Sequence, residues 1–188
     1  MKTIFWGLFL AWIHLTVNWD GASVEILPAC IGWYIVLKGV RELPLCAARD
    51  NLEKPLRVMI ALAAVQWCMN LFGGLGILGN GVGLLATFIE LYVLWLLIEL
   101  VAAIELMVSH SMPVESLRTL WKADFACSLV LSLLPLFGAL GFAIVLAGGL
   151  AKLALLLAML YQFWQAVKGY EEALAHPVEL LPPGDPED

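Results

Sequence analysis

The chain has 188 residues, of which 62% are hydrophobic and 14% are charged, and its mean hydropathy is +0.91. Soluble domains average about 45–50% apolar and about 25% charged residues, so this composition excludes an ordinary water-soluble protein. The formal net charge is −6, and six of the sixteen acidic residues follow Lys168. The rest of the chain is therefore close to neutral, and it has no basic aromatic patch of the kind that binds nucleic acid.

Six apolar runs predict an all-α integral membrane bundle of about six transmembrane helices. A helix crosses the hydrocarbon core with about 20 mostly apolar residues, and runs of that order occur at residues 3–17, 26–40, 56–78, 84–108, 125–146 and 150–167. The first two runs are short, so their helices must thin the bilayer, lie under interfacial residues or pack as a shallow pair. We expect one membrane domain at residues 1–172 and an acidic, proline-rich, disordered tail at residues 173–188.

Residues 16–35, TVNWDGASVEILPACIGWYI, separate the first two runs and allow three interpretations. A secretory signal would explain the charged start and apolar middle of the first run, but the small-residue cleavage site is poor and another apolar run follows at once. LPAC, at residues 27–30, resembles a lipoprotein processing box, but Asp20 and Glu25 separate it from the run that it should adjoin. A membrane hairpin explains all the features, since NWDG favours a turn and Pro28 fits a first helical turn.

The basic residues predict how the bundle is oriented, because cytoplasmic loops carry an excess of lysine and arginine. If both termini are cytoplasmic, nine of the ten basic residues fall on one side: Lys2, Lys38, Arg41, Arg49, Lys54, Arg57, Arg118, Lys122 and Lys168. Lys152 is the exception. We therefore expect a multi-pass protein of the cell membrane with both termini in the cytoplasm.

An internal echo suggests two tandem helical hairpins. FGGLG at residues 72–76 matches FGALG at residues 137–141, an offset of 65 residues. Helices 3–4 and 5–6 would then be repeats in the same orientation. GLGILG at residues 74–79 also fits a dinucleotide-binding pattern by letter, but that motif needs a preceding strand in a soluble sheet-and-helix unit. We therefore expect no nucleotide.

The segment between the fourth and fifth runs, SHSMPVESLRTLWK, has two interpretations. Val114, Leu117 and Trp121 would share one face of a short interfacial helix that continues into the fifth run. A plain polar loop explains the same residues.

Ionisable residues inside apolar runs are the best candidates for function, because a charge at the bilayer centre costs about 2.5–3.5 kcal/mol. Glu90, Glu99 and Glu105 lie in the fourth run, but their spacing does not place them in one cluster. Glu90 and Lys152 differ in expected depth by about 6 Å, which a lysine side chain can span. We therefore hypothesise a Glu90–Lys152 pair, or a polar pathway that also includes Glu99. The alternative is that Lys152 extends to the outer surface.

A second candidate is a polar cluster at the outer mouth of the first two helices. His14, Asp20 and Glu25 could bind a cation or relay a proton there, but we favour the alternative that they are solvated turn residues and a packing histidine. The four cysteines have no metal-ligand spacing and fit buried thiols. No catalytic motif is found, so we expect no metal, no cofactor and no enzymatic activity.

Residues 20–43, DGASVEILPACIGWYIVLKGVREL, resemble a signature near the N-terminus of a family of uncharacterised small multi-pass membrane proteins of Gram-positive gut bacteria. The residues that match are Glu25, Leu27, Pro28, Ile31, Gly32, Trp33 and Gly39. The family often has an acidic residue directly after the proline, where this chain has Ala29. The resemblance implies a multi-pass membrane protein and brings no substrate or reaction.

Three functions remain open from the sequence, of which an intramembrane enzyme is the least favoured. The first is a non-enzymatic structural or accessory component of the membrane, whose partners would be the bilayer and another membrane protein or a second copy of the chain. The alternative is a small transporter or channel for an ion or small solute, with Glu90, Glu99, Lys152 and His14 along its path.

Overall fold

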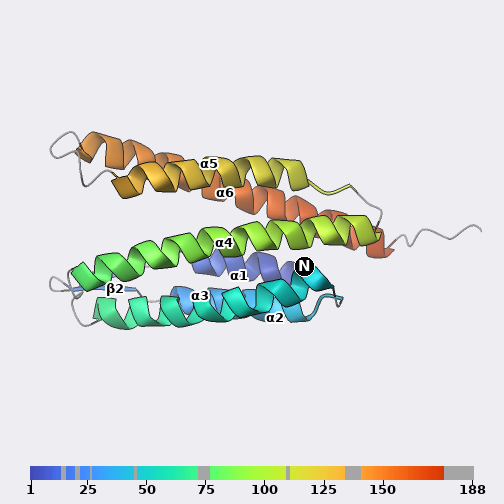
Figure 1. The fold of residues 1–188 in the computed structure, drawn as a ribbon, viewed down its shortest axis with the longest axis horizontal. Coiled ribbons are helices and arrows are strands. Elements are labelled where there is room, and N and C mark those ends of the chain that lie inside the picture. The colour runs from blue at the N-terminus through green and yellow to red at the C-terminus, as the bar shows by residue number, and fades with distance from the viewer. Residues whose placement is uncertain are drawn as a thin grey trace, which may run out of the picture.

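Six α-helices and one short β-hairpin make up the described part of the chain in a computed structural model (Figure 1). The structure describes residues 1–13, 16–19, 22–25, 27–44, 46–71, 77–108, 111–133 and 141–175, with the backbone alone at 16–19, 22–25, 71, 77–80, 133 and 141–146. The elements are α1 (Lys2–Trp12), β1 (Thr16–Trp19), β2 (Ala22–Glu25), α2 (Ala29–Arg41), α3 (Ala47–Leu71), α4 (Ile77–Val108), α5 (Val114–Leu133) and α6 (Gly141–Ala175). The predicted helical fold with six helices is confirmed.

The first two helices are shorter than predicted, and a β-hairpin joins them. β1 and β2 are antiparallel, with Thr16 opposite Glu25 and Trp19 opposite Ala22. The predicted chain reversal is thus confirmed, but the predicted helix bounds of 3–17 and 26–40 are wrong. An apolar run alone does not distinguish a strand from a helix, and the β-branched residues in this stretch favour strands. Pro28 is the N-cap of α2, one position before the first helical turn where it was expected.

α3 begins nine residues before the apolar run that predicted it. Its first turns are charged and contain Pro55, so the hydrophobic pattern gives no sign of them. The Glu53 carboxylate lies 3.9 Å from Arg49 and 3.0 Å from Arg57, each four residues away along the helix. Such pairs stabilise an exposed helix, and they account for the extension into polar sequence.

The break between the last two helices was predicted in the wrong place. We expected it near residues 147–149, but α6 already begins at Gly141 and continues through both glycines to Ala175. Gly148 faces α5, where a Cβ atom would lie 2.5 Å from a Leu131 methyl carbon. These glycines therefore permit close packing and do not end a helix. The helical interpretation of the segment after residue 110 is confirmed, because α5 starts at Val114 and has no break before Leu133.

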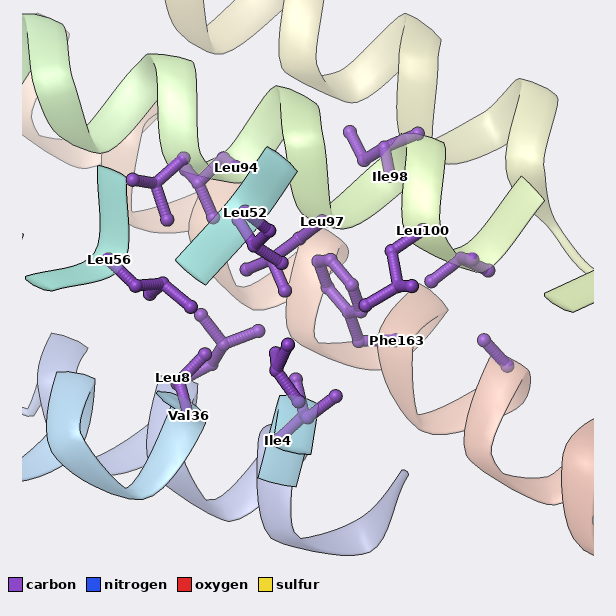
Figure 2. Close-up of a cluster of buried hydrophobic side chains, with 14 of the residues drawn as sticks. Ile4, Leu8, Val36, Leu52, Leu56, Leu94, Leu97, Ile98, Leu100 and Phe163 are labelled. Carbon is purple, nitrogen blue, oxygen red and sulfur yellow. The ribbon is translucent and has the colours of Figure 1, made fainter. Parts of the chain in front are cut away.

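The buried core lies between α1, α2, α3 and α4, and α6 completes it (Figure 2). Ile4, Leu8 and Val36 meet Leu52, Leu56 and Leu97 in this cluster, and Phe163 reaches it from α6. α5 packs along α6 and also contacts α4. α3 and α4 lie side by side and antiparallel, and so do α5 and α6, as expected for two consecutive hairpins (Figure 1).

Two described helical stretches are long and apolar enough to cross a membrane, Gly81–Val108 and Ala147–Ala175. Only 22% of the apolar window in the second stretch is buried by the rest of the chain. Figure 1 shows the first residue and the C-terminal ends of α2, α4 and α6 at one end of the bundle. Residues 176–188, which include most of the predicted tail, lie outside the described residues, and α6 extends three residues past the expected domain end.

Candidate functional site

Glu90 is held against α1 by a hydrogen bond that crosses the bundle. The Trp12 indole nitrogen, at the C-terminal end of α1, donates to the Glu90 Oε1 atom at 2.8 Å. Both side chains are only partly buried. Trp12 is the last residue of α1, and β1 begins four residues later at Thr16. The predicted intramembrane carboxylate thus has a fixed position and a neutral donor at one oxygen.

Beside Glu90, the first four helices enclose a cavity of about 200 Å³. Glycine and alanine residues make room for the cavity, and polar and aromatic side chains form the rest of its wall. The lining consists of Ala11 from α1, Ala29 and Trp33 from α2, Met59, Ala63, Gln66 and Trp67 from α3, and Gly83, Ala86, Thr87 and Glu90 from α4. Thr87 donates its hydroxyl to the Gly83 carbonyl oxygen at 3.0 Å, one turn earlier. One carboxylate, one amide and two indole rings therefore surround a volume suited to a small molecule.

The structure does not bring Glu90 and Lys152 together. Lys152 lies on α6 and donates to the Ser128 hydroxyl oxygen at 2.9 Å, whereas Glu90 accepts a hydrogen bond from Trp12 on α1. The misplaced helix break explains the difference, because Lys152 is eleven residues inside α6 and not three residues from its start. Lys152 is half-buried beside α5.

Glu99 has an ion-pair partner that the sequence did not suggest. The Arg118 guanidinium lies 3.1 Å from Glu99 and 2.9 Å from Glu115, so it joins α4 to the first turn of α5. Glu105, nearer the end of α4, accepts the Met112 backbone N–H at 2.9 Å and so helps to position the start of α5. Both carboxylates belong to the α4–α5 connection and lie apart from the Glu90 cavity.

The predicted outer-mouth cluster falls largely outside the described residues. His14 and Asp20 are outside them, and Glu25 is described only as the last residue of β2. Among the described side chains, no group of three histidine, cysteine, aspartate or glutamate residues could hold a metal ion.

A polar cluster between α5 and α6 was missed by the sequence interpretation. Asp124 is 2% exposed and Ser128 is 4% exposed, and these are the buried polar residues in the described part of the chain. The four-residue spacing places both on one face of α5, and Lys152 approaches this face from α6. Asp124 escaped notice because the fifth apolar run was taken to begin at residue 125, which put Asp124 in a polar connection.

Arginines surround Glu53 where α2 and α3 meet. Arg41 lies 3.4 Å and Arg57 3.0 Å from Glu53, and Arg49 donates to the Leu43 carbonyl oxygen at 3.0 Å. Burial acts to raise the pKa of the Glu53 carboxyl group, but hydrogen bonds and charge interactions with Arg41 and Arg57 outweigh it, so this pKa lies below its usual value. The cluster fixes the α2–α3 corner and has no cavity of its own.

Comparisons of the chain with protein-family models, with curated proteins and with solved structures find no match. The resemblance in residues 20–43 therefore stays a prediction, and the candidate site is argued from its geometry.

Proposed function

We propose that the protein is a multi-pass membrane protein with both ends of the chain in the cytoplasm. The exposed surface supports this, since Leu106, Leu150 and Leu157 are 83%, 62% and 59% exposed and would be unfavourable in water. The C-terminal end of α2 and the first turns of α3, which carry Lys38, Arg41, Arg49, Lys54 and Arg57, lie at the end of the bundle that holds the first residue (Figure 1), in agreement with the cytoplasmic excess of lysine and arginine in membrane proteins. A fluorescent protein that folds only in the cytosol, fused to the C-terminus, should fluoresce, and a dark but membrane-inserted fusion would reverse the orientation.

The proposed biochemical role is to bind a small organic cation in the cavity of the first four helices, as a transporter or solute-capturing component of the membrane. The observation that carries this proposal is the position of the Glu90 carboxylate in the wall of a 200 Å³ cavity that Trp33 and Trp67 also line. An ionisable side chain inside a membrane bundle is costly and commonly marks a functional site. Indole rings attract organic ammonium ions through cation–π interactions, so the carboxylate and the rings favour the same ligand class.

The size of the cavity limits the ligand. Sites for drug-sized molecules have volumes of about 300–1,000 Å³, so the present cavity fits a smaller molecule, such as a short primary amine or a tetramethylammonium ion. A purely structural component of the membrane would need an acceptor for Trp12 at this place but neither a charge nor a cavity, and we therefore favour solute binding over the scaffold role.

A binding titration tests the proposal. The full chain in lipid nanodiscs is titrated with tetramethylammonium chloride while tryptophan fluorescence is recorded, with sodium chloride and neutral tert-butanol as parallel titrants. We expect a saturable change with tetramethylammonium alone. Glu90→Gln should weaken this binding at least about tenfold, because a charged partner contributes about 1.5–3 kcal/mol.

Glu105→Gln is the matched control, since it makes the same change on the same helix outside the cavity and keeps an acceptor for the Met112 amide. It should bind the cation as the unmodified protein does. Equal responses to the cation and to tert-butanol, or unchanged affinity in Glu90→Gln, would overturn the cation site and restore the scaffold hypothesis.

A further inference from the structure

The α5–α6 hairpin contains a second buried polar site, separate from the cavity of the first four helices. Asp124 and Ser128 lie one turn apart on α5, and the Lys152 ammonium group on α6 donates to the Ser128 hydroxyl oxygen at 2.9 Å. α5 and α6 pack closely beside the site, because the Cys127 thiol approaches the Gly148 carbonyl oxygen at 3.7 Å and a side chain at Gly148 would collide with Leu131.

The Asp124 carboxyl group is the unusual member of this site. Its Oδ1 atom is buried and has no hydrogen-bond partner among the described residues. Lys152 is close enough to interact electrostatically with Asp124, yet its ammonium group is bonded to Ser128 and forms no described ion pair with Asp124. A buried, ionised carboxylate with an open oxygen and a cation within reach would be expected to take that cation as its direct partner.

The other charged groups on the helices that pack against α5 are occupied elsewhere. On α4, Glu90 accepts from Trp12, Glu99 pairs with Arg118, and Glu105 accepts from the Met112 amide. On α6, Lys168 lies over the Trp164 ring at the far end of the helix, and Glu171 pairs with Lys2 there. Lys152 is thus the charge that faces Asp124.

We propose that Asp124, Ser128 and Lys152 form a proton-exchange site inside the α5–α6 hairpin. In the arrangement seen here, Asp124 is a neutral carboxylic acid and Lys152 is bonded to Ser128. When Asp124 releases its proton to water, the O–H bond breaks, the electron pair stays on the carboxylate, and the Lys152 ammonium group turns from Ser128 to Asp124. The site therefore changes from a net charge of +1 to neutral, and proton uptake reverses each step.

This site does not depend on cation binding at Glu90. It stands on a different pair of helices, and its test is a titration of the protein alone, so either proposal can fail while the other holds.

Infrared difference spectroscopy of the full chain in lipid nanodiscs tests the site. Spectra recorded as pH rises should show the loss of a carbonyl stretch from a protonated carboxyl group. Asp124→Asn should remove this titrating band, whereas Glu90→Gln should retain it. A band that titrates unchanged in Asp124→Asn, or no titrating band in the unmodified protein, would overturn the proposal.

Two further variants keep the test decisive if Asp124→Asn fails to fold. Lys152→Met removes the cation that receives the carboxylate, so the midpoint of the band should move to higher pH by at least about one unit, a tenfold change in proton affinity. Ser128→Ala frees Lys152 for Asp124, so the midpoint should move to lower pH. A merely structural cluster predicts lower thermal stability with no opposite shifts, and that result would also overturn the proposal.

Discussion

A Cβ atom placed on Gly32 would lie 2.3 Å from the backbone nitrogen of Ala11. α1 and α2 therefore pack backbone to backbone at this point. Gly7 and Gly39 repeat the arrangement along the same pair, with a Cβ at 2.6 Å from the Val36 nitrogen and at 2.7 Å from the Ile4 nitrogen. Two of the residues that carry the resemblance near the N-terminus, Gly32 and Gly39, thus have a direct packing explanation.

Gly32→Ala should destabilise the protein, because the obstacle is backbone and cannot rotate away. Forcing one extra methyl group into a packed interface costs about 1–3 kcal/mol, so the thermal midpoint in detergent should fall by several degrees. Gly149→Ala is the matched control, since nothing lies within 4 Å of its Cβ position. It should be neutral or slightly stabilising. Equal losses in both variants would show that the α1–α2 contact is looser than described.

The number of helices could be predicted from the sequence, whereas their ends could not. Whether a segment avoids water depends mainly on its content of apolar residues, which can be read from the sequence. Each of the six apolar runs therefore corresponds to one of the six helices. The ends depend on interactions that composition does not reveal. Salt bridges around Glu53 extend α3 into polar sequence, and α6 continues through two glycines, of which Gly148 packs against Leu131.

The candidate site could also be predicted only in part, because the sequence reveals a charged residue in an apolar run but not the residue that it contacts. Glu90 stood out as a charge in an apolar run, but its partner Trp12 is 78 residues away and only the fold brings them together. Asp124 was overlooked because the start of α5 was predicted about three turns too late, at residue 125 and not at Val114. Lys152 was noticed, yet the misplaced break between the last two helices put it three residues from the start of a helix, whereas it lies eleven residues inside α6 and donates to Ser128 on α5.

The hydrogen bond between Trp12 and Glu90 should be measurable as a coupling energy. Trp12→Phe removes the donor and keeps an aromatic ring, and Glu90→Leu removes the acceptor. Hydrogen bonds to charged groups contribute about 1.5–3 kcal/mol, and partial burial here favours the lower part of that range. A double-mutant cycle on unfolding in mixed micelles should give a coupling of about 1 kcal/mol. Additive effects of the two substitutions would mean that the bond contributes nothing to stability.

Arg118 should matter far more to stability than its exposed partner Glu115. Arg118→Met leaves the partly buried Glu99 carboxylate without its cation and removes this ion pair between α4 and α5, so we expect a clear loss in the free energy of unfolding. The Glu115 side chain is 86% exposed, and Glu115→Gln should cost less than about 0.5 kcal/mol. Urea unfolding of both variants in micelles provides the comparison, and a loss of similar size in Glu115→Gln would contradict the assigned role of Glu99.

Glu53 should give the protein a stabilising contribution that disappears in acid. Its pKa in the folded protein is lowered, after the opposing effect of burial, by hydrogen bonds and charges from Arg41 and Arg57. A group whose pKa is lower in the folded state stabilises that state above its unfolded pKa, and this contribution is lost as pH falls through the folded pKa. Glu53→Gln should therefore melt at a lower temperature than the unmodified protein at pH 7, and the difference should shrink to nothing below the folded pKa. Arg41→Gln should reduce the same acid dependence, because it removes one of the two arginines that lower this pKa. Thermal melts across a pH series measure both effects, and a difference that persists unchanged into strong acid would show that Glu53 acts through packing and not through its charge.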